Sequence, residues 1–333
     1  MSKVSVLIAV YNAEKYLEQC LESVCSQSLR DIQIVCVNDC STDSSAEILD
    51  RYAKTDKRIT VIHLLENSGQ AVARNEGLKI ADGEFVMMLD SDDWLEYDAI
   101  EKAYRAITAE EDIDCCLLDL ILYYQDEERM EAFNNRTEKT LLTGEEAFKL
   151  SLFWNIHGLY LIRASIHKAH PYDTSCRLFS DDNTTHIHYL YSRKVVFSKG
   201  RYYYRKHSAS MTTAMTIRRF DYLEAILNMK RTLEIEIGKG RISEPEKILN
   251  KYETYRWLNI VDAYWVYYSN RTLFTEQECK EIESRIADKL KTVERFRIPL
   301  SLKIKLGYYP FRSYKVFSFV EDFYFRLRKL IGH

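Results

Sequence analysis

The 333-residue sequence contains no long apolar run, and this absence is the first constraint on what it encodes. No segment approaches the roughly 18 consecutive apolar residues that a membrane-spanning helix requires. The first residues lead straight into a strand-like pattern and show no signal-peptide layout. These absences predict a cytoplasmic protein without a membrane-spanning helix.

Metal-ligand spacing is also missing among the eight cysteines. Cys36 and Cys116 lie inside apolar runs, where a free thiol behaves as a small hydrophobic side chain. The sequence also lacks a fixed-period repeat and a low-complexity linker. We therefore expect free thiols in a reducing compartment, and neither a zinc site nor a disulfide-stapled domain.

Strand-like and helix-like segments alternate along the first 125 residues. Continuous β-branched and aliphatic runs, typical of strands buried on both faces, occur at residues 4–10, 32–37, 59–64, 84–89 and 115–124. Apolar residues at helical spacing lie between these runs. Short connections between such units predict an α/β fold with a mainly parallel central sheet.

The alternation weakens after residue 125, and the pattern is mostly helical from residue 217 onward. We predict a first domain over residues 1–216, with halves 1–125 and 126–216, and then a helical C-terminal region over 217–333. In that region, helical spacing covers residues 220–238, 245–270 and 275–293. The body and these helices carry enough apolar spacing to close a core without the residues that follow.

Residues 295–333 contain nine Lys and Arg residues and only two acids, so this tail carries a net charge of +7. Ten aromatic residues are interleaved with the basic ones. The combination favours contact with an anionic membrane surface, where rings lie at the headgroup level and basic groups meet lipid phosphates. The alternative is an ordinary amphipathic helix packed on the core. A nucleic-acid partner is not expected, because nothing in the first 215 residues fits one.

Acidic residues follow two of the predicted strands. Asp90, Asp92 and Asp93 end the run FVMMLDSDDWL, while Asp39 and Asp43 follow the second strand. Ligands bind at the carboxyl ends of parallel strands, and acids gathered there repel one another unless a cation is present. Because Mg²⁺ and Mn²⁺ prefer one or two carboxylates together with diphosphate oxygens, the pattern predicts a metal site for a phosphorylated ligand. The alternative is a solvated turn with a helix cap.

Spaced motifs in a fixed order point to a family. They read VSVLIAVYNAEKYLEQCLESVCSQSL, IQIVCVNDCSTDSS and ENSGQAVARNEGLKIADGEFVMMLDSDDWL. Over residues 3 to about 125, and loosely to about 215, the chain resembles the family 2 glycosyltransferases of the GT-A fold. The resemblance implies an inverting hexosyl- or N-acetylhexosaminyl-transferase that uses a nucleotide-diphosphate sugar, usually UDP-linked, and a divalent metal, Mn²⁺ or Mg²⁺.

The resemblance also assigns roles to individual residues. The nucleotide sugar would be bound by Val10, Tyr11, Asn12, Glu14, Asp39, Asp43, Asn67, Gly69, Arg74, Asp90 and Ser91. Asp90 would face the ribose, Asp92 would bind the metal, and Asp93 would flank them. The segment YYYRKHSASMTT resembles a further motif of the family, which places His207 at the metal or the diphosphate.

A general base is expected across the sugar from the metal, because the acceptor hydroxyl loses a proton as it attacks. The segment LFSDDNTTHIHYL supplies Asp182, carried over as the base, and Asp181 as a supporting acid. The alternative is a pair of acids at a helix N-terminus. His157, His186 and His188 are expected to be structural.

Three residues depart from the family pattern. Asn38 replaces its usual first acid, Cys40 replaces a glycine, and Ala9 replaces a common proline. Asn38 and Cys40 alter the expected shape of the base pocket, but neither removes a group that the chemistry requires.

Two other functions are compatible with acids at a strand edge. A nucleotidyltransferase would favour a Gly-rich basic loop near the N-terminus, which VYNAEKYL does not provide. An inactive nucleotide-sugar-binding module would not need Asp90, Asp92, Asp182 and His207. The acceptor is expected to be a glycan or a lipid-linked carrier at the inner face of the membrane, as for many relatives.

Overall fold

The computed structural model describes residues 2–174, 179–207 and 215–330. The chain divides into two compact units, residues 1–208 and 209–333. The sequence placed this division between residues 216 and 217. Each unit has its own hydrophobic core and is described separately below.

The N-terminal half of unit 1 is a parallel sheet of four strands. In it β1 pairs with β2 and with β4, and β2 pairs with β3, all in parallel. The strands are β1 (Val4–Val10), β2 (Ile32–Asn38), β3 (Ile59–His63) and β4 (Phe85–Met88). Each coincides within a residue or two with a predicted run, since a strand covered on both faces requires continuous apolar sequence.

The sheet continues through β6, which the sequence predicts over residues 115–124, and through further strands that the sequence did not reveal. Strand β9 lies antiparallel between β4 and β6, and β10 runs parallel to β6. The bounds are β5 (Trp94–Leu95), β6 (Ile113–Tyr124), β7 (Arg129–Ala132), β8 (Leu141–Thr143), β9 (Tyr160–Arg163) and β10 (Lys194–Lys206). The order is β3-β2-β1-β4-β9-β6-β10-β5. Because β6 and β10 run in the direction of β1 to β4, the predicted mainly parallel sheet is confirmed.

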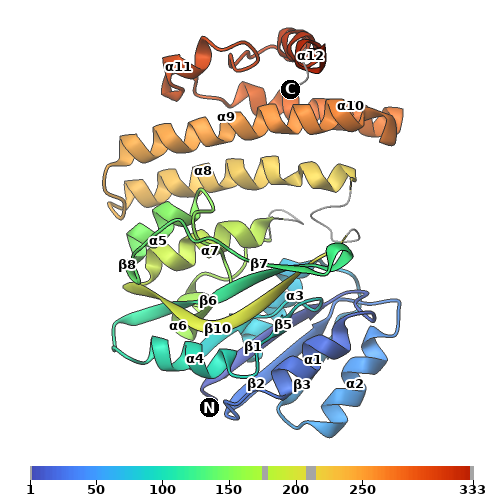
Figure 1. The fold of residues 1–333 in the computed structure, drawn as a ribbon, viewed down its shortest axis with the longest axis vertical. Coiled ribbons are helices and arrows are strands. Elements are labelled where there is room, and N and C mark those ends of the chain that lie inside the picture. The colour runs from blue at the N-terminus through green and yellow to red at the C-terminus, as the bar shows by residue number, and fades with distance from the viewer. Residues whose placement is uncertain (1, 175–178, 208–214, 331–333) are drawn as a thin grey trace. The chain divides into compact units, whose positions relative to one another are not determined.

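Helices cover both faces of the sheet (Figure 1). On one face α1 (Leu17–Cys25), α2 (Ser45–Thr55) and α4 (Ala99–Ile107) pack with alternate β1 residues such as Val6 and Ile8. On the other, α3 (Gln70–Ile80) and α6 (Ala164–Ala169) pack with Leu7 and Val35. The unit also contains η1 (Gln125–Glu127), α5 (Gly144–Ser151) and α7 (Ser180–Tyr191).

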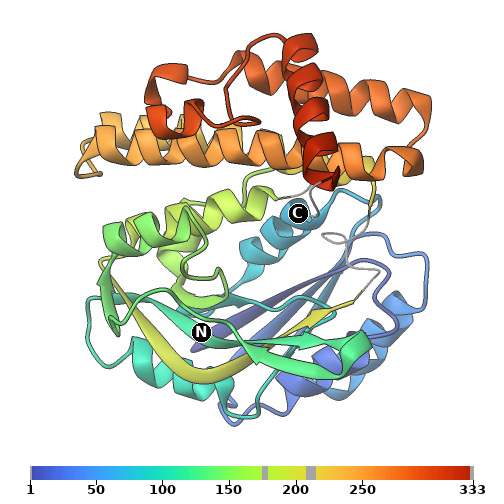
Figure 2. The same ribbon diagram turned by 45° about the horizontal axis from the view of Figure 1, so that its top comes forward.

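Unit 2 is helical, as predicted. Its main helices are α8 (Tyr222–Gly238), α9 (Pro245–Asn270), α10 (Glu276–Lys291), α11 (Leu300–Lys303) and α12 (Tyr314–Leu330). Short 3-10 turns occur at η2 (Ile217–Asp221), η3 (Arg271–Leu273) and η4 (Arg295–Arg297). Figure 2 shows α12 across α9 and α10, in agreement with shared core residues.

The prediction that the helices up to residue 293 close the core without the tail is wrong. Phe317 and Phe325 of α12 are 0% and 2% exposed and belong to the core of unit 2. The indole Nε1 of Trp257 donates a hydrogen bond to the Tyr308 carbonyl at 2.9 Å, and the Trp257 ring packs against Phe317. One face of the tail is therefore part of the core, because its aromatic residues fill the space beside α9.

Two expectations about absences concern the described residues. Across residues 2–174, 179–207 and 215–330, no helix combines the length and the apolar character needed to cross a membrane. The seven cysteines that the structure describes are free thiols, as predicted. Cys176 lies outside the described residues.

Candidate functional site

The loops after β1 and β2 lie at one edge of the sheet and are joined by hydrogen bonds. Asn12, with a φ of 49°, accepts a bond from the Thr42 N–H at 2.8 Å. The Glu14 N–H donates to Asp43 Oδ2, and the Ser44 N–H donates to the Glu14 carboxylate, both at 3.0 Å. Thus Asn12, Glu14 and Asp43, three predicted nucleotide-binding residues, come together and fix the shape of this edge.

These bonds set the ionisation of Asp43. Partial desolvation of its carboxylate acts to raise the pKa, but hydrogen bonds from Ser45 and from the Glu14 N–H outweigh it and lower the pKa below the ordinary value. The anion is therefore held in place by N–H and O–H donors rather than by a basic side chain.

Asp39 ties the end of β2 to the loop before α3. Its carboxylate is 2% exposed and accepts bonds from the Ser68 N–H (2.7 Å), the Gly69 N–H (2.9 Å) and Asn67 Nδ2 (3.1 Å). Gly69 has a φ of 93°, a conformation that glycine adopts without a Cβ penalty. Asp39 thus holds Asn67 and Gly69, two other predicted site residues, in position through hydrogen bonds.

Two of the three departures from the family pattern, Asn38 and Cys40, have physical explanations. Asn38 Nδ2 donates to His63 Nδ1 at 3.1 Å while Asn38 Oδ1 accepts from the Ser41 N–H, so an amide provides a donor that a carboxylate lacks. Cys40 has a φ of 58°, in the left-handed region where a glycine would be usual. Such a conformation costs a residue with a Cβ about 1–2 kcal/mol. Cys40 thus holds a glycine-like backbone conformation in this loop.

Asp90 follows β4 and is held by α3. Arg74, 5% exposed, donates from Nη2 to Asp90 Oδ1 at 2.6 Å, and Gln70 Nε2 reaches the same oxygen at 3.2 Å. The Asp93 N–H donates to the Asp90 carbonyl at 3.0 Å, which closes a tight turn through Ser91. Asp90 and Arg74, predicted separately, therefore form a charge pair at the strand end.

Asp92 and His207 meet across 115 residues of sequence. His207 Nε2 lies 3.2 Å from Asp92 Oδ2. Two neighbouring ligands of an octahedral ion, each at about 2.1 Å, stand about 3.0 Å apart. A carboxylate suits Mg²⁺ and Mn²⁺, and a neutral imidazole is a common metal ligand, so the two side chains could hold a divalent ion together. Among the residues that the structure describes, no group of three or more His, Cys, Asp or Glu side chains is placed to hold an ion.

Asp93 has a structural position beside the site. It is 1% exposed and accepts bonds from the Tyr202 hydroxyl at 2.8 Å and from the Arg205 N–H at 2.7 Å. Burial, followed by the charges of Asp90 and Asp92, raises the pKa of Asp93 well above its ordinary value. Asp93 therefore anchors the turn to β10 rather than facing a ligand.

Asp182, the expected general base, and Asp181, the expected supporting acid, lie in the first turn of α7. The Asp181 side chain is outside what the structure describes, whereas Asp182 is partly exposed. Contacts lead from the site to α7: the Arg74 guanidinium lies 5.3 Å from the Tyr172 ring, and the Asp173 N–H donates to Thr184 Oγ1 at 3.0 Å. A hydrogen bond therefore joins α7 to Asp173, and the residue before Asp173, Tyr172, contacts Arg74.

The sequence did not reveal several residues that shape the site. The Tyr202 hydroxyl accepts from the Asp90 N–H at 3.0 Å while it donates to Asp93. The Tyr16 ring lies 5.0 Å from the His207 ring. In the sequence, Tyr202 belongs to an aromatic run before Arg205, and Tyr16 is a tyrosine at helical spacing. Both patterns are equally typical of core residues, so neither indicated a role at the site. Of the predicted residues, Val10 is buried in β1, and Tyr11 is half exposed beyond it.

Comparison with known proteins places these features in a family. A family model described as Glycosyl transferase family 2 matches residues 5–170. Putative glycosyltransferase EpsH of Bacillus subtilis (strain 168) is 47% identical over 113 residues, 34% of this chain and 33% of EpsH. Glycosyltransferase GlyG of Streptococcus pneumoniae serotype 4 (strain ATCC BAA-334 / TIGR4) is 30% identical over 225 residues, 62% of this chain and 72% of GlyG. The chain thus spans a third of EpsH and nearly three quarters of GlyG.

Solved structures share the architecture. The S. aureus TarS 1-349 structure in complex with UDP-GlcNAc has a TM-score of 0.73 at 20% identity, covering 97% of this chain and 92% of that chain. Mannosyltransferase PcManGT from Pyrobaculum calidifontis, in complex with GDP-Man and Mn²⁺, has a TM-score of 0.55 at 15% identity over 99% of this chain and 87% of that chain. At these identities the similarity shows the fold, and the predicted GT-A-like α/β architecture is confirmed.

Proposed function

Because this chain belongs to glycosyl transferase family 2, we propose that it transfers a hexose or N-acetylhexosamine from a UDP-linked donor to a hydroxyl of a glycan or lipid-linked acceptor, with inversion. The observation that carries the proposal is the pair Asp92–His207, which lies beside Asp90–Arg74 at the carboxyl edge of the sheet. The donors UDP-GlcNAc and GDP-Man in similarly folded proteins support a nucleotide sugar here.

The residues divide the chemistry between them. Asp92 and His207 would hold Mn²⁺ or Mg²⁺, which when bound stabilises negative charge on the departing diphosphate. Asp90, fixed by Arg74, would orient the ribose, and the loops built on Asp39 and Asn12 would enclose the nucleoside. Asp182 would accept the proton of the acceptor hydroxyl. At the same time the hydroxyl oxygen would bond to C1 of the sugar, and the bond from C1 to the diphosphate oxygen would break.

The donor half of the proposal is tested by calorimetry with UDP, GDP and CMP in Mn²⁺. We expect UDP to bind only with the ion present, and Asp92→Asn to weaken that binding at least about 100-fold, since the variant loses a charged metal ligand. Asp119→Asn, on strand β6 and 39% exposed, is the matched control and should bind UDP as wild type does. If Asp92→Asn bound UDP as tightly as wild type in Mn²⁺, Asp92 would not be a metal ligand.

The base is tested through slow hydrolysis of the donor. Asp182→Asn should leave donor affinity nearly unchanged and lower turnover by at least about 100-fold, as expected for loss of a general base. Asp181→Asn should do less harm, and the reverse order would move the base to Asp181. Proton NMR of the released sugar should show the opposite anomer from the donor. Binding of UDP without any turnover of wild type would instead indicate an inactive nucleotide-sugar-binding module.

We also propose that the chain works at an anionic membrane surface, through the exposed face of the tail. The tail exposes large apolar side chains, and also cations with no ion-pair partner among the described residues. The apolar members that are at least half exposed are Phe296, Leu300, Ile304, Phe319, Phe323 and Leu330, and the cations are Lys305, Arg312, Lys315 and Arg326. Of the tail's two acids, Glu321 is buried, whereas Asp322 is partly exposed and accepts a hydrogen bond from the Tyr264 hydroxyl.

Co-sedimentation with vesicles tests the membrane surface. Replacing Phe319 and Phe323 by Ser should reduce binding to phosphatidylglycerol vesicles about tenfold without unfolding, because both rings lie on the exposed side of α12. Leu273→Ser, equally exposed elsewhere in unit 2, is the control. Binding should also fall with salt, since attraction is screened over about 10 Å at 0.1 M. Equal binding to neutral vesicles, or none to anionic ones, would contradict the proposal.

A further inference from the structure

A cationic side chain is enclosed directly behind the proposed metal pair. Arg205 lies near the end of β10 and is 6% exposed. Its guanidinium is 4.6 Å from the ring of Tyr16, 4.7 Å from that of Trp94 and 5.6 Å from that of Tyr123. These rings come from three separate parts of unit 1, so Arg205 joins them at a single point.

The same guanidinium holds the backbone of the acidic turn. Its Nε donates to the Asp92 carbonyl at 2.8 Å, and its two terminal nitrogens donate to the side-chain amide oxygens of Gln125 and Gln19. The Arg205 N–H meanwhile donates to Asp93. All the acceptors of the guanidinium are uncharged, and its positive charge lies beside the acidic turn that holds Asp92.

Tyr16 connects this arrangement to the second member of the metal pair. Its ring contacts the Arg205 guanidinium on β10 and also lies 5.0 Å from the His207 ring. One cluster, Arg205 with Tyr16, therefore contacts the backbone of Asp92 and the ring of His207. Arg205 contacts Asp92 through the main-chain carbonyl, and Tyr16 contacts His207 through its ring, which makes them positioning residues rather than ligands.

We propose that the Arg205–Tyr16 cluster positions Asp92 and His207 for the metal ion and thereby sets metal affinity; the inference rests on the proposed function. Loss of a residue that orients a metal ligand typically weakens metal binding by about 10- to 100-fold. Arginine is required because its planar group stacks on rings while it donates in several directions, which a lysine ammonium does not do.

The test is the Arg205→Lys variant, which keeps the charge and removes the planar group. Titration of Mn²⁺ in the presence of UDP, followed by electron paramagnetic resonance, measures metal affinity without turnover. We expect the Mn²⁺ dissociation constant to rise at least about tenfold. Donor hydrolysis at saturating Mn²⁺ should recover to within about threefold of wild type, because the ligands themselves are intact. Arg201→Lys, four residues earlier on β10 and 50% exposed, is the matched control and should change neither value.

A milder variant keeps the test decisive if Arg205→Lys does not fold. Gln19→Ala removes one partner of the guanidinium from the exposed side of α1 and should weaken Mn²⁺ a few-fold in the same direction. A lower melting temperature with an unchanged Mn²⁺ dissociation constant in either folded variant would overturn the inference and leave the cluster a purely structural one. Failure of wild type to bind Mn²⁺ with UDP would instead overturn the proposed function.

Discussion

Lowering the pH from 6.5 to about 5 is expected to unfold unit 1, because four neutral histidines are buried in it. His157, His167, His186 and His188 are at most 5% exposed. Desolvation lowers the pKa of His157 and His188 to about 4 and that of His186 to about 3, and it also lowers the pKa of His167. His188 is fixed as the neutral form, since its Nδ1 accepts from the Tyr160 hydroxyl and its Nε2 donates to the His170 carbonyl.

The sign follows from proton binding. Between pH 6.5 and 4 the unfolded chain protonates these histidines, whereas the folded chain does not, so their contribution is fully present above pH 6.5 and is lost as the pH falls. Asp93 acts oppositely, because its raised pKa makes the folded state bind a proton first. With four histidines acting one way and Asp93 the other, the unfolded state binds about three more protons than the folded state near pH 5. The free energy of unfolding then falls by about 4 kcal/mol for each pH unit of acidification. A typical domain has only about 5–15 kcal/mol in total.

Urea unfolding between pH 7.5 and 5, with pulse proteolysis to identify the unit that opens, measures this slope. His186→Asn should reduce it by about one proton, near 1.4 kcal/mol per pH unit. Ser151→Ala removes the hydroxyl that lies 2.9 Å from His186 Nδ1 but no titrating group, so it should lower stability by the same amount at every pH. A slope near zero, or one shared equally by unit 2, would contradict the assignment.

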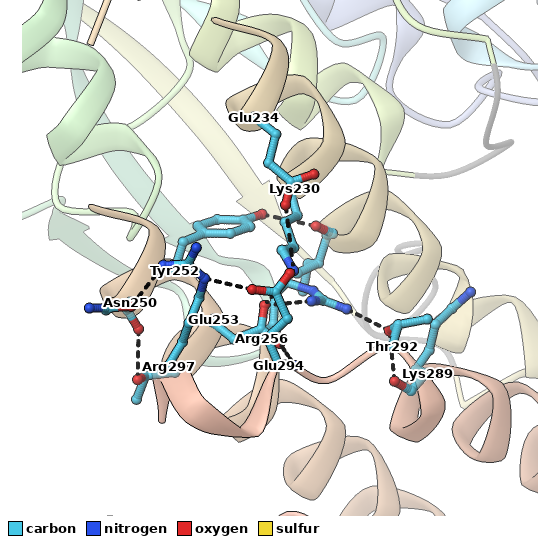
Figure 3. A network of polar contacts seen from close by, with 12 residues as sticks. Lys230, Glu234, Asn250, Tyr252, Glu253, Arg256, Lys289, Thr292, Glu294 and Arg297 are labelled. Carbon is cyan, nitrogen blue, oxygen red and sulfur yellow. Dashed lines mark hydrogen bonds and ion pairs between the residues drawn. The ribbon is translucent and has the colours of Figure 1, made fainter. Parts of the chain in front are cut away.

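Replacing Glu253 by Ala should destabilise unit 2 by about 3–5 kcal/mol, because it leaves two buried cations without their shared anion. Glu253 is 0% exposed on α9. It pairs with Arg256 at 2.6 Å and with Lys230 at 3.2 Å, and it accepts the Glu294 N–H at 2.8 Å (Figure 3). The variant keeps Glu294 and the more distant Glu234 opposite Lys230, and Thr292 opposite Arg256.

The matched control is Lys280→Ala, which breaks the exposed Glu276–Lys280 pair of α10 in the same unit. Exposed pairs of this kind contribute about 0.3–0.5 kcal/mol, so the two variants should differ roughly tenfold in effect. Chemical denaturation followed by tryptophan fluorescence, with pulse proteolysis to identify unit 2, reports on the core that both variants share. If Glu253→Ala unfolds no more readily than Lys280→Ala, the network does not stabilise the unit.

The sequence by itself determined the parallel strands and the acids that follow them. A strand covered on both faces needs a continuous apolar run, and the end of that run locates the carboxyl edge of the sheet within a residue or two. Asp39, Asp90 and Asp92 could therefore be placed on one edge without coordinates. The order of the motifs added the family, and with it the expected roles of Arg74 and His207.

Only the tertiary structure decided which distant groups meet. Strand β10 was not visible as a strand, because its aromatic and basic residues follow neither a continuous nor an alternating apolar pattern, yet it carries Arg205 and His207 to Asp92. The tail shows the same limit. Phe317 and Phe319 are both apolar, but one is buried and the other 75% exposed. Composition does not distinguish two faces of one helix, since burial depends on what the rest of the chain places against each face.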